Sequence, residues 1–114
     1  MDVKEMVYDN LASAFSKDRV SYFYPKSFKE LPAVSYYEIS QRPFSFADDE
    51  AYLIESLIEV SVFSASSAVL FCMGALADET MKKAGFVRVE VKESYDKENL
   101  IYKRTHIYKI LIGG

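Results

Sequence analysis

Hydrophobic residues recur at helical spacing in two stretches of the chain. In residues 2–15 the apolar side chains fall on one stripe, which predicts a first helix with Asp2 as its N-terminal cap. A second helix is predicted over residues 68–84, between hydroxyl-bearing residues 64–67 and Gly85, a residue suited to a left-handed helix end. The spacing predicts that its buried stripe consists of Val69, Cys72, Met73, Leu76, Thr80 and Ala84.

Alternation of hydrophobic and polar positions predicts strands in the rest of the chain. Three strands are expected before the second helix, at residues 20–24, 33–40 and 51–63. The third contains no Gly or Pro and could span roughly 40 Å, well beyond an ordinary strand. A small domain cannot cover such a strand with its own core, so part of it is expected to project toward something else.

The last two strands are predicted as a hairpin, with residues 87–92 alternating, a turn at 96–99 and a return over 100–112. The element order α-β-β-β-α-β-β predicts one α+β domain over residues 1–114, with one mostly antiparallel sheet and two helices packed on one face. The predicted core between helices and sheet is Ile58, Val60, Val62, Val69, Met73, Leu76, Val87 and Val89.

Residues 42–50 (RPFSFADDE) are predicted to form a loop before the long strand. Phe44 and Phe46 lie in this polar setting, where apolar rings either fold back onto the core or anchor into a partner. The adjacent acids Asp48, Asp49 and Glu50 are read as solvated, as a protein contact or as a metal site. Hard-cation sites usually draw oxygens from several spaced positions, so the metal site is the least favoured reading.

Composition and charge add a preference for assembly. The chain has nine Tyr and eight Phe, more than one modest core needs, and aromatic residues are enriched at interfaces. Residues 1–81 hold six basic and thirteen acidic side chains, and residues 82–114 hold eight and four. A net charge of −3 argues against nucleic-acid binding, whereas unlike charge in two parts of the chain favours contacts between unlike surfaces of neighbours.

Little in the sequence indicates catalysis. His106 is the only histidine, Cys72 is placed on an apolar stripe, and no phosphate loop or nucleophile motif is present. We therefore expect a protein that is not an enzyme and has no catalytic, cofactor-binding or metal-binding residues. A single cysteine and the lack of a signal segment or long apolar run predict a cytoplasmic protein without a membrane partner.

Four segments carry a resemblance to a known family: residues 31–36 (LPAVSY), 46–52 (FADDEAY), 59–64 (EVSVFS) and 84–86 (AGF). In these segments, and in its element order, the chain resembles the small tail-completion or tail-terminator proteins of long-tailed bacteriophages and prophages, which join head to tail. The resemblance implies a non-enzymatic virion protein that forms a ring, commonly of six copies, on the head-facing end of the tail tube. Its implied partners are further copies of itself, the tail-tube protein and the head connector, with DNA passing through the ring without sequence-specific binding. Its implied location is the host cytoplasm during assembly and then the neck of the virion tail.

The long strand and its preceding loop are expected to make the ring contacts. The anchors and charged groups expected at the subunit interface are Phe44, Phe46, Tyr52, Asp48, Asp49, Glu55 and Glu59, with Arg88, Lys103 and Arg104 on the next subunit. Alternatives are another neck adaptor, a tail-tube protein, or a small α+β ligand-binding domain or enzyme. Polar groups converging in a pocket near Tyr22, Tyr36 or His106 would favour the ligand-binding alternative.

Overall fold

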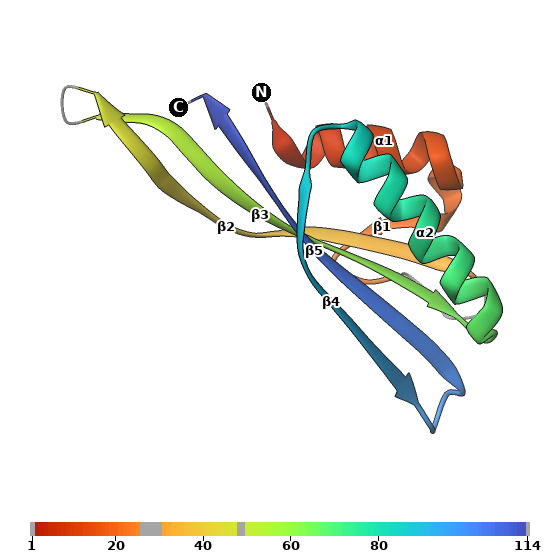
Figure 1. Ribbon diagram of the computed structural model, residues 1–114. Helices are drawn as coiled ribbons and strands as arrows, with labels where there is room; N and C mark the ends of the chain where they lie inside the picture. The colour runs from red at the N-terminus through yellow and green to blue at the C-terminus, as the bar shows by residue number, and fades with distance from the viewer. Residues whose placement is uncertain (1, 26–30, 48–49, 114) are drawn as a thin grey trace.

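Two helices lie on one face of a five-stranded sheet (Figure 1). The structure is a computed structural model that describes residues 2–25, 31–47 and 50–113. In chain order the elements are α1 (Val3–Phe15), a 3-10 turn (Lys17–Arg19), β1 (Val20–Tyr22), β2 (Ala33–Ala47), β3 (Glu50–Ser64), α2 (Ser67–Lys83), β4 (Val87–Asp96) and β5 (Ile101–Gly113). The predicted α+β class and element order are confirmed.

The strands are arranged in the order β1-β2-β3-β5-β4. The short β1 runs parallel to β2, and every other pair is antiparallel. The central β3 pairs with β2 along one edge and with β5 along the other, from Leu53 opposite Gly113 to Ser64 opposite Tyr102. The prediction of one mostly antiparallel sheet is confirmed.

Helix α1 forms as its sequence pattern predicts. The Asp2 carboxylate accepts a hydrogen bond of 2.9 Å from the backbone N–H of Lys4 and so caps the first turn. Val3, Val7 and Leu11 are buried on the stripe that faces the sheet.

Helix α2 begins and ends with the expected signals. The Ser66 hydroxyl accepts a hydrogen bond of 3.3 Å from the backbone N–H of Val69. At the other end Gly85 has φ 99°, and the N–H groups of Gly85 and Phe86 donate to the carbonyls of Lys82 and Met81, each at 3.0 Å. This pair of bonds is a Schellman motif, which glycine favours because it adopts positive φ without strain.

The predicted buried stripe of α2 is wrong. Of its six residues only Met73 is buried, Val69, Cys72 and Leu76 are exposed, and Thr80 and Ala84 are half-buried. The buried stripe consists of Leu70, Met73, Gly74, Ala77 and Met81. Residues 68–77 are apolar or small on every side, so helical spacing fits two neighbouring stripes equally well.

The loop predicted at residues 42–50 is wrong where the structure describes it. Arg42–Ala47 continue β2, Glu50 begins β3, and the register pairs Arg42 with Glu55 and Ala47 with Glu50. Pro43 indicated a loop, but β1 pairs with β2 only as far as Tyr36. Proline is tolerated on an edge strand because no neighbouring strand requires its N–H.

Residues 42–47 and 50–55 form a projection that we call the arm. It extends past the helices at the end of the sheet opposite the start of α2 (Figure 1). The β2–β3 register shifts at Ile39 and at Phe44, so each of these residues is the extra residue of a β-bulge. Bulges turn side chains out of the regular alternation, and both of these apolar side chains are exposed.

Strand β4 contributes less to the core than predicted. Val87 and Val89 are exposed, so their assignment to the core is wrong, and only Val91 in this strand is half-buried. Strand β4 is an edge strand beyond the area that the helices cover (Figure 1). Alternation in a sequence identifies the two faces of a strand but not whether a helix covers either of them.

The main core lies between the helices and the centre of the sheet. Ile58, Val60 and Val62 belong to it, as predicted. Its other members are Val3, Val7, Leu11, Val20, Val34, Tyr36, Leu70, Met73, Ala77, Met81, Phe86 and Tyr108. A smaller cluster of Ala33, Phe63 and Ile101 contains the residues that alternate with this core.

Candidate assembly interface

The arm carries the aromatic anchors that the sequence predicted. Phe44 is 57% exposed and lies beside Arg42, Pro43 and Glu55, which line a shallow hollow with it. Phe46 lies in β2 and Tyr52 in β3, where the backbone alone is described. Asp48 and Asp49 lie outside the described residues.

The two predicted acidic partners on β3 have neighbours within the chain. Glu55 forms an ion pair of 3.1 Å with Arg42 across the β2–β3 pair. Glu59 lies opposite Tyr37 in the same register, and burial together with this carboxylate raises the pKa of the Tyr37 hydroxyl. Exposed ion pairs contribute little to stability, so Glu55 can exchange Arg42 for another cation at small cost.

The predicted basic partners lie on β4 and β5, away from the arm. Arg88 pairs with Asp78 at 3.2 Å, and Arg104 pairs with Glu93. The ammonium group of Lys103 lies 5.7 Å from the ring centre of Tyr24. The structure therefore divides the predicted interface residues into an arm group and a β4–β5 group that do not meet within one chain.

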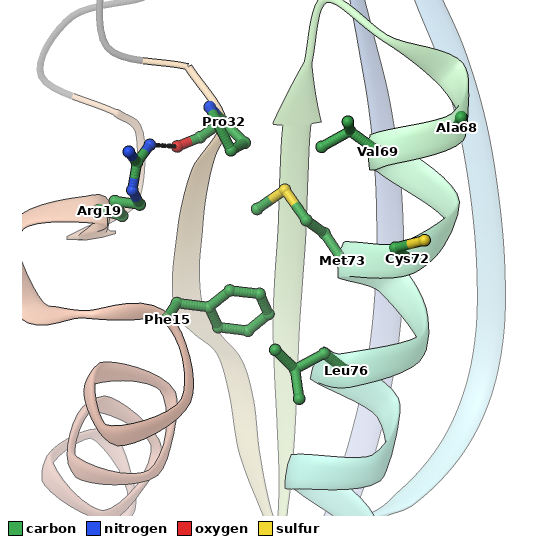
Figure 2. A pocket seen from close by; sticks show the side chains of 8 residues that line it. All are labelled: Phe15, Arg19, Pro32, Ala68, Val69, Cys72, Met73 and Leu76. Carbon is green, nitrogen blue, oxygen red and sulfur yellow. Dashed lines mark hydrogen bonds between the residues drawn. The ribbon is translucent and has the colours of Figure 1, made fainter.

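A second apolar surface, which the sequence analysis missed, lies between the end of α1 and the start of α2. It is a hollow of about 360 Å³ that we call the α2 groove (Figure 2). Its lining residues are Phe15, Arg19, Pro32, Ala68, Val69, Cys72, Met73 and Leu76.

Figure 2 shows how the walls of the α2 groove are built. The Phe15 ring projects from the end of α1 toward Met73 and Leu76 of α2. On the far side Arg19 donates a hydrogen bond of 2.8 Å to the carbonyl oxygen of Pro32, which fixes the guanidinium at the rim. The uncharged run at residues 68–77 is the sequence signal that could have revealed this surface, because it makes α2 apolar all round.

A polar network joins α2 to β5 inside the molecule. Arg104 Nε donates to His106 Nε2 at 2.9 Å, so the neutral imidazole carries its proton on Nδ1. His106 Nδ1 then donates to the Tyr108 hydroxyl at 2.7 Å, and that hydroxyl donates to Asp78 Oδ1 at 3.1 Å. The other Asp78 oxygen accepts from Lys82 at 2.8 Å and from Arg88 at 3.2 Å.

Burial and charge set the protonation states in this network. Burial, reinforced by the Arg104 charge, lowers the pKa of His106 to about 4. Burial and the nearby Asp78 carboxylate raise the pKa of Tyr108. Burial alone would raise the pKa of Asp78, but hydrogen bonds from Lys82 and Tyr108 outweigh it and hold the pKa below its ordinary value.

The network has the properties of a structural element. His106 is 2% exposed and Tyr108 is fully buried, and their polar atoms are paired with one another and with α2. The cavities described above are lined by other residues. The sequence signal for it is the alternation of Arg104, His106 and Tyr108, which places three polar side chains on one face of β5.

Metal ligation finds no centre in the part of the chain that the structure describes, where no three His, Cys, Asp or Glu side chains gather. Cys72 lies in the wall of the α2 groove and is exposed, which corrects its predicted burial. Neither described helix has both the length and the apolar character required to cross a membrane.

Comparison with known proteins gives no family for this chain. No protein-family model matches the sequence, and a search of curated proteins finds no match.

Proposed function

We propose that this chain is a non-enzymatic structural protein of a long-tailed bacteriophage or prophage. In this proposal it forms a ring at the head-proximal end of the tail tube, ends tail assembly and joins the tail to the head. It assembles in the host cytoplasm and remains in the neck of the virion, and DNA passes through the ring.

The arm is the observation that carries this proposal. It extends the sheet beyond the helices and presents Phe44, an aromatic side chain that is 57% exposed. An exposed aromatic residue on a projecting strand pair has little value for an isolated small domain, whereas buried aromatic anchors dominate protein interfaces.

A ring also requires two different surfaces on each subunit, because a head-to-tail contact closes only when one surface meets its unlike counterpart on the neighbour. The arm and the α2 groove are two such apolar surfaces. A stable contact of this kind buries about 800 Å² on each partner.

The buried polar network supports assembly over the ligand-binding alternative. Convergence of polar groups at His106 would have favoured a ligand site if they opened into a pocket. His106 and Tyr108 are instead closed off between α2 and β5, with hydrogen bonds to each other and to Arg104 and Asp78.

Sedimentation velocity and negative-stain electron microscopy over a concentration series test the proposal. We expect closed rings of defined size, and we expect the protein to stop elongation when it is added to the tail-tube protein encoded beside its gene. A protein that stays monomeric at every concentration and leaves tube length unchanged would overturn the proposal, as would a gene with no head or tail genes near it.

A further inference from the structure

The first half of α2 is apolar on the side that faces away from the sheet. Residues 68–77 contain no charged side chain, and the charges of the helix begin at Asp78. Phe71 is 69% exposed, Val69 40% and Leu76 39%. A helix that is hydrophobic all round is normally buried on all sides, so this half of α2 is built to be covered.

The shape of the exposed surface indicates what covers it. Phe15, Pro32 and the α2 side chains enclose a hollow of about 360 Å³ (Figure 2). A hollow with apolar walls accepts a protruding apolar side chain, as in an interface where an aromatic anchor enters a pocket. A second α2 helix packed flat across it would leave the hollow unfilled, at a cost in packing energy.

The arm supplies a protruding side chain of the required kind. The bulge in β2 turns Phe44 out of the strand ladder, and Pro43 before it restricts the backbone. The arm and the start of α2 lie at opposite ends of the molecule (Figure 1). Phe44 therefore cannot fill the groove of its own chain, but it can fill the groove of a neighbour in a head-to-tail contact.

The charges around the two surfaces are complementary. The arm contains Asp48, Asp49 and Glu50 in sequence, while its Arg42 is paired with Glu55. The α2 groove has Arg19 in its lining, and Lys17 precedes it in the same short turn. An acidic arm next to a basic rim favours this pairing and disfavours arm-to-arm contact.

We propose that the α2 groove of one subunit receives the Phe44 arm of a second copy of this chain. This inference rests on the proposed ring function and identifies the two surfaces that meet. Phe44 fills the hollow between Phe15 and Leu76, and the acidic end of the arm lies against the Lys17–Arg19 turn.

The lone cysteine gives a direct test, because Cys72 lies in the groove wall. In the Phe44→Cys variant each subunit carries one cysteine on the arm and one in the groove. Mild oxidation of the assembled protein should then give a ladder of covalent oligomers that ends at the ring size. A short bismaleimide repeats the test for a gap too long for a disulfide, which requires Cα atoms within about 7 Å.

Two controls use the same chemistry. The unsubstituted protein, with Cys72 alone, should give no covalent dimer, and Phe44→Cys combined with Cys72→Ser should give no ladder. Dimers through Cys72 alone would mean that α2 faces α2, and dimers that persist without Cys72 would mean that arm meets arm. Either result overturns the arm-in-groove contact.

Substitutions provide an independent measurement. Leu76→Glu in the groove and Phe44→Ala on the arm should each weaken association about 30-fold or more, the effect of losing an interface anchor. Val89→Glu is the matched control for the groove substitution, since Val89 is also an exposed apolar residue but lies on β4. Rings that form normally in the Phe44→Ala and Leu76→Glu variants would overturn this inference and leave the ring function standing, whereas absence of rings in the unsubstituted protein would overturn both.

Discussion

Individual side chains in the α2–β5 network have defined donors and acceptors. The Nδ1 proton of His106 points to Tyr108, whose own proton points to Asp78. Arg104 reaches His106 beneath Gly74, where a Cβ atom would lie 2.8 Å from Arg104 Cδ. A histidine held in this way stays neutral, and this has consequences for stability and for the choice of glycine.

Protonation of His106 should make the fold sensitive to mild acid. Its pKa is about 4 in the folded chain, compared with about 6.5 in an unfolded one. Between these values the unfolded chain binds a proton that the folded chain does not. The free energy of unfolding should therefore be highest above pH 6.5 and fall toward pH 4, by at most about 1.4 kcal/mol per pH unit.

Urea unfolding at pH 7 and pH 5 measures this effect, because most carboxylates remain ionised over that interval. His106→Gln should remove the pH dependence even if it lowers stability at both pH values. An equally steep loss of stability in the His106→Gln variant would assign the effect to other groups.

Gly74→Ala should raise the pKa of His106. The added methyl group must displace the Arg104 side chain, which removes a positive charge and a hydrogen bond from the imidazole. An alanine in a helix is otherwise favourable by about 1 kcal/mol, so a neutral or negative effect on stability would also reveal the lost contacts. The NMR titration of the single histidine gives the pKa directly, and Arg104→Met should raise it in the same direction. A pKa that stays near 4 in both variants would contradict the arrangement.

At the scale of elements, α2 separates what spacing can predict from what it cannot. The ends of α2 follow from local chemistry, since Ser66 caps its start and Gly85 its end. Its orientation depends on which of two apolar stripes meets the sheet, and only the packed structure decides between them. Residue types also misled at the arm, because Pro43 is excluded from central strands but not from an edge.

Long-range groups were the other limit of the sequence. The Tyr108–Asp78 hydrogen bond joins residues 30 positions apart, and the walls of the α2 groove come from α1, α2 and the start of β2. Alternation and capping are local signals, so they predicted α1, the β4–β5 hairpin and the core residues of β3. They contained no information on which distant side chains would meet.

A pair of truncations on α2 tests its orientation. Met81 is fully buried, so Met81→Ala should lower the free energy of unfolding by about 2–5 kcal/mol. Leu76→Ala should cost less than about 1 kcal/mol in the monomer, because Leu76 is 39% exposed. Urea midpoints of the two variants should differ clearly, and a larger loss for Leu76→Ala would restore the stripe predicted from the sequence.

The whole molecule is elongated for its size. Its principal extents are 52, 24 and 22 Å, and its radius of gyration is 15.1 Å, compared with about 13 Å for a compact chain near this length. The arm and the β4–β5 hairpin extend from opposite ends of the sheet and account for this shape (Figure 1). Surface that a monomer does not need for its core is available for contacts between copies.

Removal of the arm should separate folding from assembly. A variant in which an Asn-Gly turn joins Arg42 directly to Glu55 keeps their pairing, and this turn suits a two-residue hairpin. The main core contains no arm residue, so the variant should unfold within about 1 kcal/mol of the intact chain but form no rings. Light scattering and urea unfolding give the two readouts. Ring formation without the arm would place the contact elsewhere.

The irregular outer edge of β2 has a consequence for the free subunit. A long, flat, unpaired strand is a template for aggregation, because identical chains can add to it one after another through backbone hydrogen bonds. Beyond Tyr36 this edge is interrupted by the bulges at Ile39 and Phe44 and by Pro43, which has no N–H to donate. These interruptions should keep a concentrated pool of subunits from growing into fibrils and leave side-chain contacts, with their fixed geometry, to decide how copies join.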